Sequence, residues 1–96
     1  MIASFGDDTT RHIFDGVNSK EARRIPIQLW PIIVRKLDML NVAHKLGDLS
    51  APPGNRLELL KGELKGLHSI RVNDQYRIIF RWADSNAYEV RITDYH

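Results

Sequence analysis

The fold is decided by residues 68–82, which read HSIRVNDQYRIIFRW. On both sides of the polar pair Asn73-Asp74, apolar residues alternate with polar or charged ones, and a period of two is typical of a strand with one buried face. A two-residue turn at Asn73-Asp74 would place Ile70 opposite Arg77 and mix the two faces of the sheet. An odd loop centred on Asp74 instead pairs Ile70 with Ile78, and the sequence predicts this register because a one-residue slip exchanges the faces. The other pairs in this register are Val72 with Tyr76 and Arg71 with Arg77.

The same alternation continues on both sides of this hairpin. It starts after Arg56 and runs to the end of the chain, so four strands are expected. Their apolar positions are Leu57, Leu59, Ile70, Val72, Ile78, Phe80, Trp82, Tyr88, Val90 and Ile92. A three-residue loop at 84–86 is expected, and its pairs are Phe80 with Val90, Arg81 with Glu89 and Arg77 with Thr93. The simplest arrangement is an antiparallel meander with helices on one face.

The start of the chain has the pattern of a short helix. This helix is expected over residues 11–16, capped by Asp7 or Asp8 and closed by Gly16. Its buried side is expected to consist of Ile13, Phe14 and Val17. Residues 2–5 are a candidate for a short strand.

A longer helix is expected within residues 28–44. Because Pro31 is tolerated only in a first turn, the regular helix should begin near Leu29 or Trp30, and Gly47 should mark its end. Its buried stripe is expected to be Leu29, Ile33, Leu37 and Leu40, with Arg35, Lys36 and Asp38 off the stripe. The prolines in residues 50–55 then predict a loop.

The composition is that of one ordinary folded domain. The chain has 96 residues and a mass of 11.1 kDa, with 43% hydrophobic and 27% charged residues, which excludes a disordered tail. It has no cysteine, so disulfides, thiolate metal sites and thiol nucleophiles are excluded. No apolar run approaches the roughly 20 residues of a membrane-spanning helix, and the N-terminus lacks the features of a signal peptide, so a cytoplasmic protein is expected. The net charge is +2, and nine of the fourteen basic residues are arginines, whose planar fork suits phosphate binding.

The face of the predicted sheet that points away from the core carries the candidate site. Its residues are Arg71, Arg77, Arg81, Glu89, Arg91, Thr93 and, if the last strand continues, Tyr95 beside Gln75. Arg81 and Glu89 are expected to form an ion pair across strands. In the predicted register, no obvious partner lies beside Arg71 or Arg77 in the same row across the strands, except that Glu58 could reach them from the first strand. Unpaired arginines and an aromatic ring at the end of a sheet suit a phosphate and a base, and the alternative is a solvated sheet face.

Three segments carry a resemblance to a known family. They are residues 52–62 (PPGNRLELLKG), residues 68–80 (HSIRVNDQYRIIF) and the closing Asp94-Tyr95-His96. Together they resemble the HigB-type toxins of the RelE/ParE superfamily of bacterial toxin–antitoxin systems, also called plasmid maintenance killer proteins. Residues 1–5 and 35–41 are similar too, so the resemblance covers residues 1–96 as a single domain. It implies a RelE-like α+β fold, with two N-terminal helices packed on a curved, mainly antiparallel sheet of four to five strands.

The resemblance also implies an activity and its partners. It predicts a ribosome-dependent endonuclease of messenger RNA that acts in the A site of the 30S subunit and is neutralised by a helix-turn-helix antitoxin of the HigA type. The chemistry expected is attack of a ribose 2′-OH on the adjacent phosphate, without a metal ion or other cofactor. The product would carry a 2′,3′-cyclic phosphate.

Such a reaction needs a base for the 2′-OH, an acid for the departing 5′-oxygen and positive donors for the charge of the phosphorane. By the resemblance, Arg77 matches the catalytic arginine of the family, and Lys61 matches a lysine that can serve the same charge. Tyr95 would stack on or hydrogen-bond the nucleotide, and Asp94 would orient its neighbours or contact the base. His96 would act as an acid or base near neutral pH.

The chain departs from the family pattern at two positions. Glu58 stands where relatives with the best-known site have a histidine, so it is either the general base or the counter-ion of Arg71 or Arg77. Asn73 stands where some relatives carry a basic residue, while Arg71 lies two positions earlier. Arg71, Asn73 and Arg91 are expected to contact RNA.

Two other functions remain open at the level of the sequence. One is a ParE-like poison of DNA gyrase, and the other is a catalytically weak homologue that binds its antitoxin as a co-repressor. Outside the candidate site, Tyr88 is expected to be a core aromatic residue, and His68 is expected to make a structural hydrogen bond.

Overall fold

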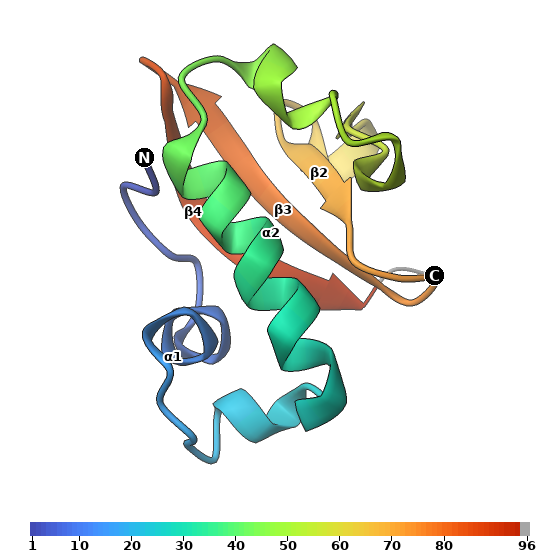
Figure 1. The fold of residues 1–96 in the computed structure, drawn as a ribbon. Coiled ribbons are helices and arrows are strands. Elements are labelled where there is room, and N and C mark those ends of the chain that lie inside the picture. Colours follow the sequence, from blue (N-terminus) through green and yellow to red (C-terminus); the bar gives the residue numbers. More distant parts are fainter. Residues whose placement is uncertain (95–96) are drawn as a thin grey trace.

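The computed structural model describes residues 1–94 (Figure 1). These residues form two α-helices, α1 (Asp8–Asp15) and α2 (Trp30–Val42), and one four-stranded antiparallel sheet. The strands are β1 (Glu58–Leu59), β2 (His68–Arg71), β3 (Tyr76–Ala83) and β4 (Asn86–Asp94), in the order β1-β2-β3-β4. The predicted α+β class with two helices and an antiparallel meander is confirmed. In the described part of the chain, no helix is long and apolar enough to cross a membrane.

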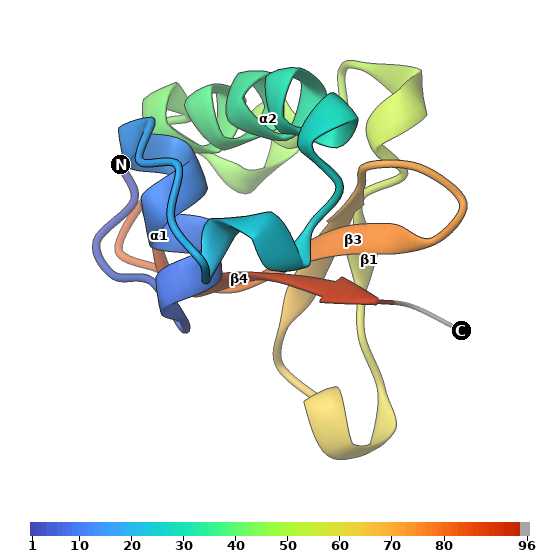
Figure 2. The ribbon, with the colours of Figure 1, turned by 90° about the horizontal axis from the view of Figure 1, so that it is seen from below.

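The helices cover one face of the sheet and leave the other face open. In Figure 2, α1 and α2 lie on one side of β3 and β4, and the connection between β1 and β2 projects on the opposite side. Fully buried side chains of both layers form the core, among them Ile13, Ile33, Leu37, Leu40, Ile70, Ile78, Phe80 and Val90. Each such side chain stabilises the fold by about 1.5–3 kcal/mol relative to an exposed one.

Helix α1 has the predicted caps. The Asp7 carboxylate accepts a hydrogen bond from the backbone N–H of Thr10 at 2.8 Å, and Gly16 adopts the left-handed conformation with φ 75°. Ile13 is buried as expected, but Val17 is 45% exposed, so its predicted burial was wrong. The reason is that Val17 follows Gly16, where the left-handed backbone turns the chain away from the helix axis.

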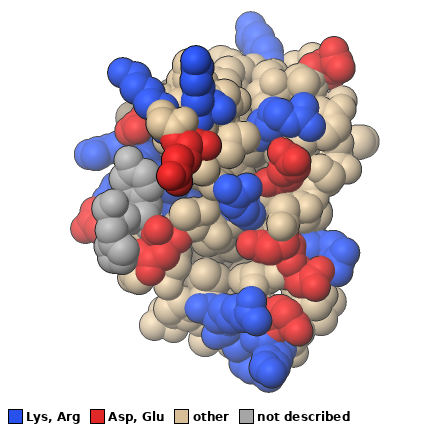
Figure 3. All heavy atoms as spheres, turned by 180° about the vertical axis from the view of Figure 1, so that it is seen from behind, with Lys and Arg blue, Asp and Glu red and all other residues tan. Residues whose placement is uncertain are grey.

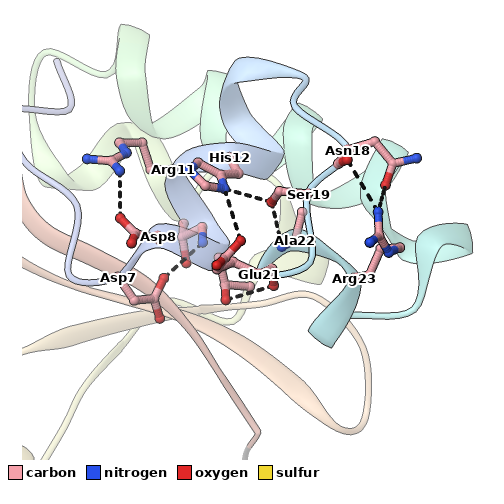
Figure 4. Close-up of polar contacts among 11 residues, drawn as sticks. Asp7, Asp8, Arg11, His12, Asn18, Ser19, Glu21, Ala22 and Arg23 are labelled. Atoms are coloured by element: carbon pink, nitrogen blue, oxygen red, sulfur yellow. Dashed lines mark hydrogen bonds and ion pairs between the residues drawn. The ribbon is translucent and has the colours of Figure 1, made fainter.

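Polar contacts tie the segment after α1 back to the helix (Figure 4). His12 Nδ1 lies 2.7 Å from Ser19 Oγ and 4.0 Å from the Glu21 carboxylate. Ser19 Oγ also accepts a hydrogen bond from the backbone N–H of Ala22 at 3.0 Å. The imidazole of His12 thus helps to hold the chain that leaves α1.

Helix α2 begins in the predicted place but ends before Gly47. Its last residue is Val42, because the Asp48 carboxylate accepts hydrogen bonds from the backbone N–H groups of His44 and Lys45 at 3.0 and 3.2 Å. These two amides are therefore not available to continue the helix. The same two hydrogen bonds lower the pKa of Asp48.

One lysine of α2 is buried, contrary to prediction. Lys36 is 8% exposed, and its Nζ donates a hydrogen bond to Asn55 Oδ1 at 2.6 Å. Asn55 is fully buried and donates from Nδ2 to the carbonyl oxygen of Leu49 at 3.0 Å. Burial lowers the pKa of Lys36, and the positive charges of Arg35 and Arg71 lower it further. Lys36 therefore anchors the loop that contains Asn55 to the helix.

The β2–β3 hairpin has the predicted register. Ile70 pairs with Ile78, and Arg71 pairs with Arg77. Ile70 and Ile78 are fully buried, so the alternation places the core face correctly on both strands.

The turn between β3 and β4 differs from the prediction. Two residues, Asp84 and Ser85, join the strands in place of the expected three-residue loop at 84–86. Their φ angles are 51° and 63°, the left-handed pair of a type I′ turn, whose twist matches that of the flanking strands.

A β-bulge restores the predicted register away from this turn. Arg81 pairs with Tyr88 rather than with Glu89, whereas Arg77 pairs with Thr93 as predicted. Glu89 lies at the bulge with φ 56°, and the bulge absorbs the one-residue difference. Tyr88 therefore lies on the same face as Arg81, and its predicted place in the core was wrong.

Residues 2–5 do not form a regular strand but lie along the outer edge of β4 (Figure 1). The two parallel bridges are Ile2 with Ala87 and Phe5 with Val90. Ser4 Oγ accepts a hydrogen bond from the backbone N–H of Glu89 at 2.8 Å. The N-terminal segment thus covers this edge of the sheet and satisfies an amide at the bulge.

Gly6 lies too close to β4 to carry a side chain. A Cβ atom there would be 2.9 Å from the backbone oxygen of Glu89 and 3.3 Å from Cδ of Arg91. Gly6→Ala is expected to lower the free energy of unfolding by about 1–3 kcal/mol, which urea denaturation would measure. The matched control is Gly47→Ala, where no atom lies within 4 Å of the added Cβ. Equal stability of the two variants would contradict the close approach at Gly6.

Candidate functional site

Figure 3 shows the open face of the sheet from the side opposite to α2. Basic and acidic side chains are interspersed over this face and do not form a surface of one sign. Its arginines are Arg71 in β2, Arg77 and Arg81 in β3, and Arg91 in β4. Within residues 1–94, no three His, Cys, Asp or Glu side chains are grouped so that they could hold a metal ion.

The Arg77 guanidinium is held by groups from two neighbouring strands. The side chain is only 12% exposed, and its Nη2 lies 3.5 Å from the Glu58 carboxylate of β1. Its Nη1 donates a hydrogen bond to Ser69 Oγ of β2 at 3.4 Å. Because Glu58 pairs with Ser69 in the sheet, the two acceptors lie side by side and engage different nitrogen atoms.

The sequence left open whether Glu58 pairs with Arg71 or with Arg77. In the structure, Glu58 forms its ion pair with Arg77. Arg71 instead pairs with Asp74, three residues further along the chain. The partner of Arg71 thus lies in the turn and not beside it in the sheet, where the predicted register offered only Glu58.

Asn73 and Asp94 stabilise the end of the sheet near Arg77. Asn73 Oδ1 accepts hydrogen bonds from the backbone N–H groups of Gln75 and Tyr76, at 2.9 and 2.7 Å. Gln75 Nε2 donates to Asp94 Oδ2 at 3.1 Å and so connects this turn to the end of β4. The carboxamide oxygen of Asn73 shapes the turn, and its predicted contact with RNA remains a prediction.

The other predicted site residues lie around this centre or outside the described residues. Lys61 is exposed and borders a hollow of about 330 Å³, whose other walls are Glu58, Leu59, Leu60 and Leu64. Arg91 is paired with Ile79, two residues from Arg77, and lies on the same face. Tyr95 and His96 lie outside the described residues 1–94, so their predicted roles remain predictions.

Two buried residues of the open face were not predicted. Ser69 is 0% exposed and Ile79 is 1% exposed, and they pair with each other between Glu58 and Arg91 in one row across the four strands. A strict alternation assigns both to solvent. The run Ile78-Ile79-Phe80 is the signal that could have found one of them, because consecutive apolar residues are typical of a strand buried on both faces.

Arg81 and Tyr88 form a separate group farther along this face. The Arg81 guanidinium carbon lies 4.6 Å from the centre of the Tyr88 ring, a cation–π geometry. Arg81 Nε also lies 3.6 Å from the Glu89 carboxylate. The predicted ion pair is therefore present, although the bulge prevents direct pairing of the two backbones.

His68 has no hydrogen-bond partner for its buried Nδ1 within the described part of the chain. The structural hydrogen bond expected for His68 is therefore not made by this atom. Its ring stacks on Phe80 with 6.0 Å between ring centres. Burial lowers the pKa of His68. Because neighbouring residues of a strand point to opposite faces, His68 lies on the face opposite to Ser69, away from the contacts of Arg77.

Comparison of the sequence with known proteins gives one family and close relatives. Residues 3–96 match the model of the HigB-like toxins, described as RelE-like toxins of the type II toxin–antitoxin system HigB. The chain is 44% identical to toxin HigB-1 of Vibrio cholerae over 87 residues, which are 91% of this chain and 90% of that protein. It is 32% identical to endoribonuclease HigB of Proteus vulgaris over 97 residues, covering all of both chains.

Comparison with solved structures supports the same type of fold. The toxin–antitoxin complex YoeB–YefM of Staphylococcus aureus contains a chain that matches with a TM-score of 0.59 and 18% identity, over 100% of this chain and 98% of that chain. YafQ of Escherichia coli matches with a TM-score of 0.56 and 13% identity, over 98% of this chain and 93% of that chain. From the family match and the identities with the two HigB proteins, we conclude that the chain belongs to the HigB-like family of RelE-like toxins of type II toxin–antitoxin systems.

Proposed function

We propose that this protein is a ribosome-dependent endonuclease of messenger RNA and that it cleaves RNA beside Arg77, on the open face of its sheet. The observation that supports the site is the Arg77 side chain, 12% exposed and held by Glu58 and Ser69. An oriented guanidinium donates two hydrogen bonds to a phosphate and stabilises the additional negative charge of the phosphorane. The family and the name of the Proteus vulgaris relative support the activity. In this proposal, one toxin domain spans residues 1–96.

The proposed reaction takes place within the RNA chain. The 2′-oxygen of one ribose forms a bond to the adjacent phosphorus, and the bond from phosphorus to the 5′-oxygen of the next nucleotide breaks. The 2′-OH proton passes to a base, and an acid delivers a proton to the departing 5′-oxygen. The two ends produced are therefore a 2′,3′-cyclic phosphate and a 5′-OH.

We assign proton transfer to His96, because an imidazole titrates near neutral pH. Tyr95 stacks on the nucleotide, and Asp94, bound by Gln75 at 3.1 Å, orients this C-terminal group. The residues that contact the RNA backbone are Lys61, Arg71, Arg91 and, through its amide, Asn73.

Glu58 is assigned to positioning Arg77, and the variant Glu58→Gln tests that role. Its amide oxygen can still accept a hydrogen bond from Arg77, so we expect the single-turnover rate to fall only about 3–10-fold, the effect of one weakened hydrogen bond. The pH dependence of the rate should stay unchanged. Glu89→Gln, which alters the carboxylate paired with Arg81 on the same face, is the matched control. A loss of more than about 100-fold, together with loss of the acidic limb of the pH profile, would instead identify Glu58 as the general base.

The family also indicates the kind of partner. A toxin of a type II system is paired with an antitoxin, and the Staphylococcus aureus neighbour was solved as a toxin–antitoxin complex. We propose a HigA-type helix-turn-helix antitoxin for this chain, and the A site of the 30S subunit, in the cytoplasm, as its place of action.

The proposal is tested with purified protein and ribosomes programmed with a defined mRNA. The expected result is cleavage only when ribosomes are present, with products that end in a 2′,3′-cyclic phosphate and a 5′-OH. A 2′-deoxyribose at the cleaved position should abolish the reaction. Growth arrest with intact mRNA and gyrase-linked DNA breaks would contradict the proposal, as would the absence of any arrest on induction.

A further inference from the structure

We propose that Ser69 is a positioning residue, whose hydroxyl acts with the Glu58 carboxylate to fix the orientation in which the Arg77 guanidinium meets the phosphate. This inference rests on the proposed function, because it assigns no reaction to Ser69 itself. The family resemblance assigns no role to Ser69, and a strict alternation would place its side chain in solvent.

The position of Ser69 in the sheet supports this role. Ser69 is 0% exposed and is paired with Glu58 on one side and Ile79 on the other. Strands favour β-branched and aromatic side chains, and a buried hydroxyl must find a hydrogen-bond partner or destabilise the fold. Packing alone therefore favours an apolar β-branched residue, valine or isoleucine, at this place. The hydroxyl is explained by its contact with Arg77 Nη1, at 3.4 Å.

The second argument is the geometry of the guanidinium. A single acceptor leaves a planar guanidinium free to rotate about that contact, whereas acceptors on two nitrogens restrict its plane. Glu58 lies 3.5 Å from Nη2, and Ser69 accepts from Nη1 at 3.4 Å. Both separations are long for hydrogen bonds, so each contact alone is weak, and it is the two together that restrict the plane of the guanidinium.

A weak contact that sets orientation has a particular kinetic signature. The charge of Arg77 persists without the Ser69 hydroxyl, so attraction between protein and RNA is maintained. The rate of the chemical step falls, because stabilisation of the phosphorane depends on the direction of the donors. The affinity for programmed ribosomes and the rate of cleavage should therefore separate.

The test compares Ser69→Ala with Ser69→Thr, which retains the hydroxyl, and with Ser50→Ala, which changes an exposed serine away from the sheet. At saturating programmed ribosomes, we expect Ser69→Ala to cleave about 3–10-fold more slowly than the unchanged protein. Its affinity for the ribosomes should change by less than about twofold, since the phosphate-binding charges are kept. Ser69→Thr should cleave within about twofold of the unchanged rate. A wild-type rate for Ser69→Ala would overturn the proposal.

A double-variant cycle keeps the test decisive if the threonine does not fit the buried position. In the background of Arg77→Ala, the change Ser69→Ala should cause no further loss, because the group that it orients is absent. The same loss in both backgrounds would show that Ser69 acts on packing, and would contradict the proposal. If Arg77→Ala itself cleaves at the wild-type rate, the proposed site fails, an outcome that is distinct from failure of Ser69 alone.

Discussion

Replacing Arg77 with alanine is expected to lower the single-turnover rate of mRNA cleavage on the ribosome by about 10²–10³-fold, the usual effect of removing a donor that stabilises an oxyanion. The Arg77 side chain is only 12% exposed, and a charge shielded from water acts more strongly on a neighbouring phosphate than a solvated one. Arg77→Lys should retain little of the effect, because an ammonium group cannot replace two hydrogen bonds from a planar fork.

The measurement for Arg77→Ala is the cleavage rate at saturating programmed ribosomes, together with the affinity for them. Arg81→Ala is the matched control, since Arg81 lies on the same strand and face and is 47% exposed in its pair with Glu89. We expect this control to cleave within about threefold of the unchanged protein, as for a solvated ion pair. An equal loss of cleavage rate in the two variants would contradict a specific role of Arg77, because it would show that Arg77 only attracts RNA as other cations of this face do.

Asn55→Leu is expected to lower the free energy of unfolding by about 3 kcal/mol, which is a large part of the stability of a small domain. The substitution removes the acceptor of the buried Lys36 ammonium, at 2.6 Å, and the donor to the Leu49 carbonyl, at 3.0 Å. An ammonium group left in an apolar place without an acceptor is strongly destabilising.

Urea denaturation of the single and double variants would measure this effect. Lys36→Met removes the charge, so the double variant Lys36→Met with Asn55→Leu should be more stable than Asn55→Leu alone by at least about 1 kcal/mol. Strictly additive losses would contradict the account, because they would mean that Lys36 and Asn55 stabilise the fold independently.

The register of the β2–β3 hairpin could be predicted because both strands constrain it. Ile70 and Ile78 each need the core face, and a loop with an odd number of residues satisfies both, whereas a one-residue slip does not. The β3–β4 turn could not be predicted in this way, because a two-residue turn with a bulge and a three-residue loop give the same pairs at the far end. The amide of Glu89 at this bulge is bound by Ser4, a contact between opposite ends of the chain that no local pattern contains.

The sequence could predict which residues share the candidate site, but not which of them contact one another. Arg77 and Glu58 share a face in any register that buries the core, but the sequence cannot say which arginine the carboxylate meets. The ion pair Arg71–Asp74 depends on the path of the turn between β2 and β3. Ser69 is uncharged, and the sequence pattern gives no sign that it contacts an arginine. Buried polar groups are found only when the side chains that surround them are known.

The central claim is that the scissile phosphate binds beside Arg77 on the open face of the sheet. The most direct test is a structure of the protein on a ribosome programmed with mRNA that carries a 2′-deoxyribose at the cleaved position, which blocks the reaction. We expect the Arg77 guanidinium within hydrogen-bond distance of a non-bridging oxygen of that phosphate, with Glu58 and Ser69 still in contact with Arg77. A phosphate bound on the helical face, or at the open face but beyond the reach of Arg77, would contradict the account.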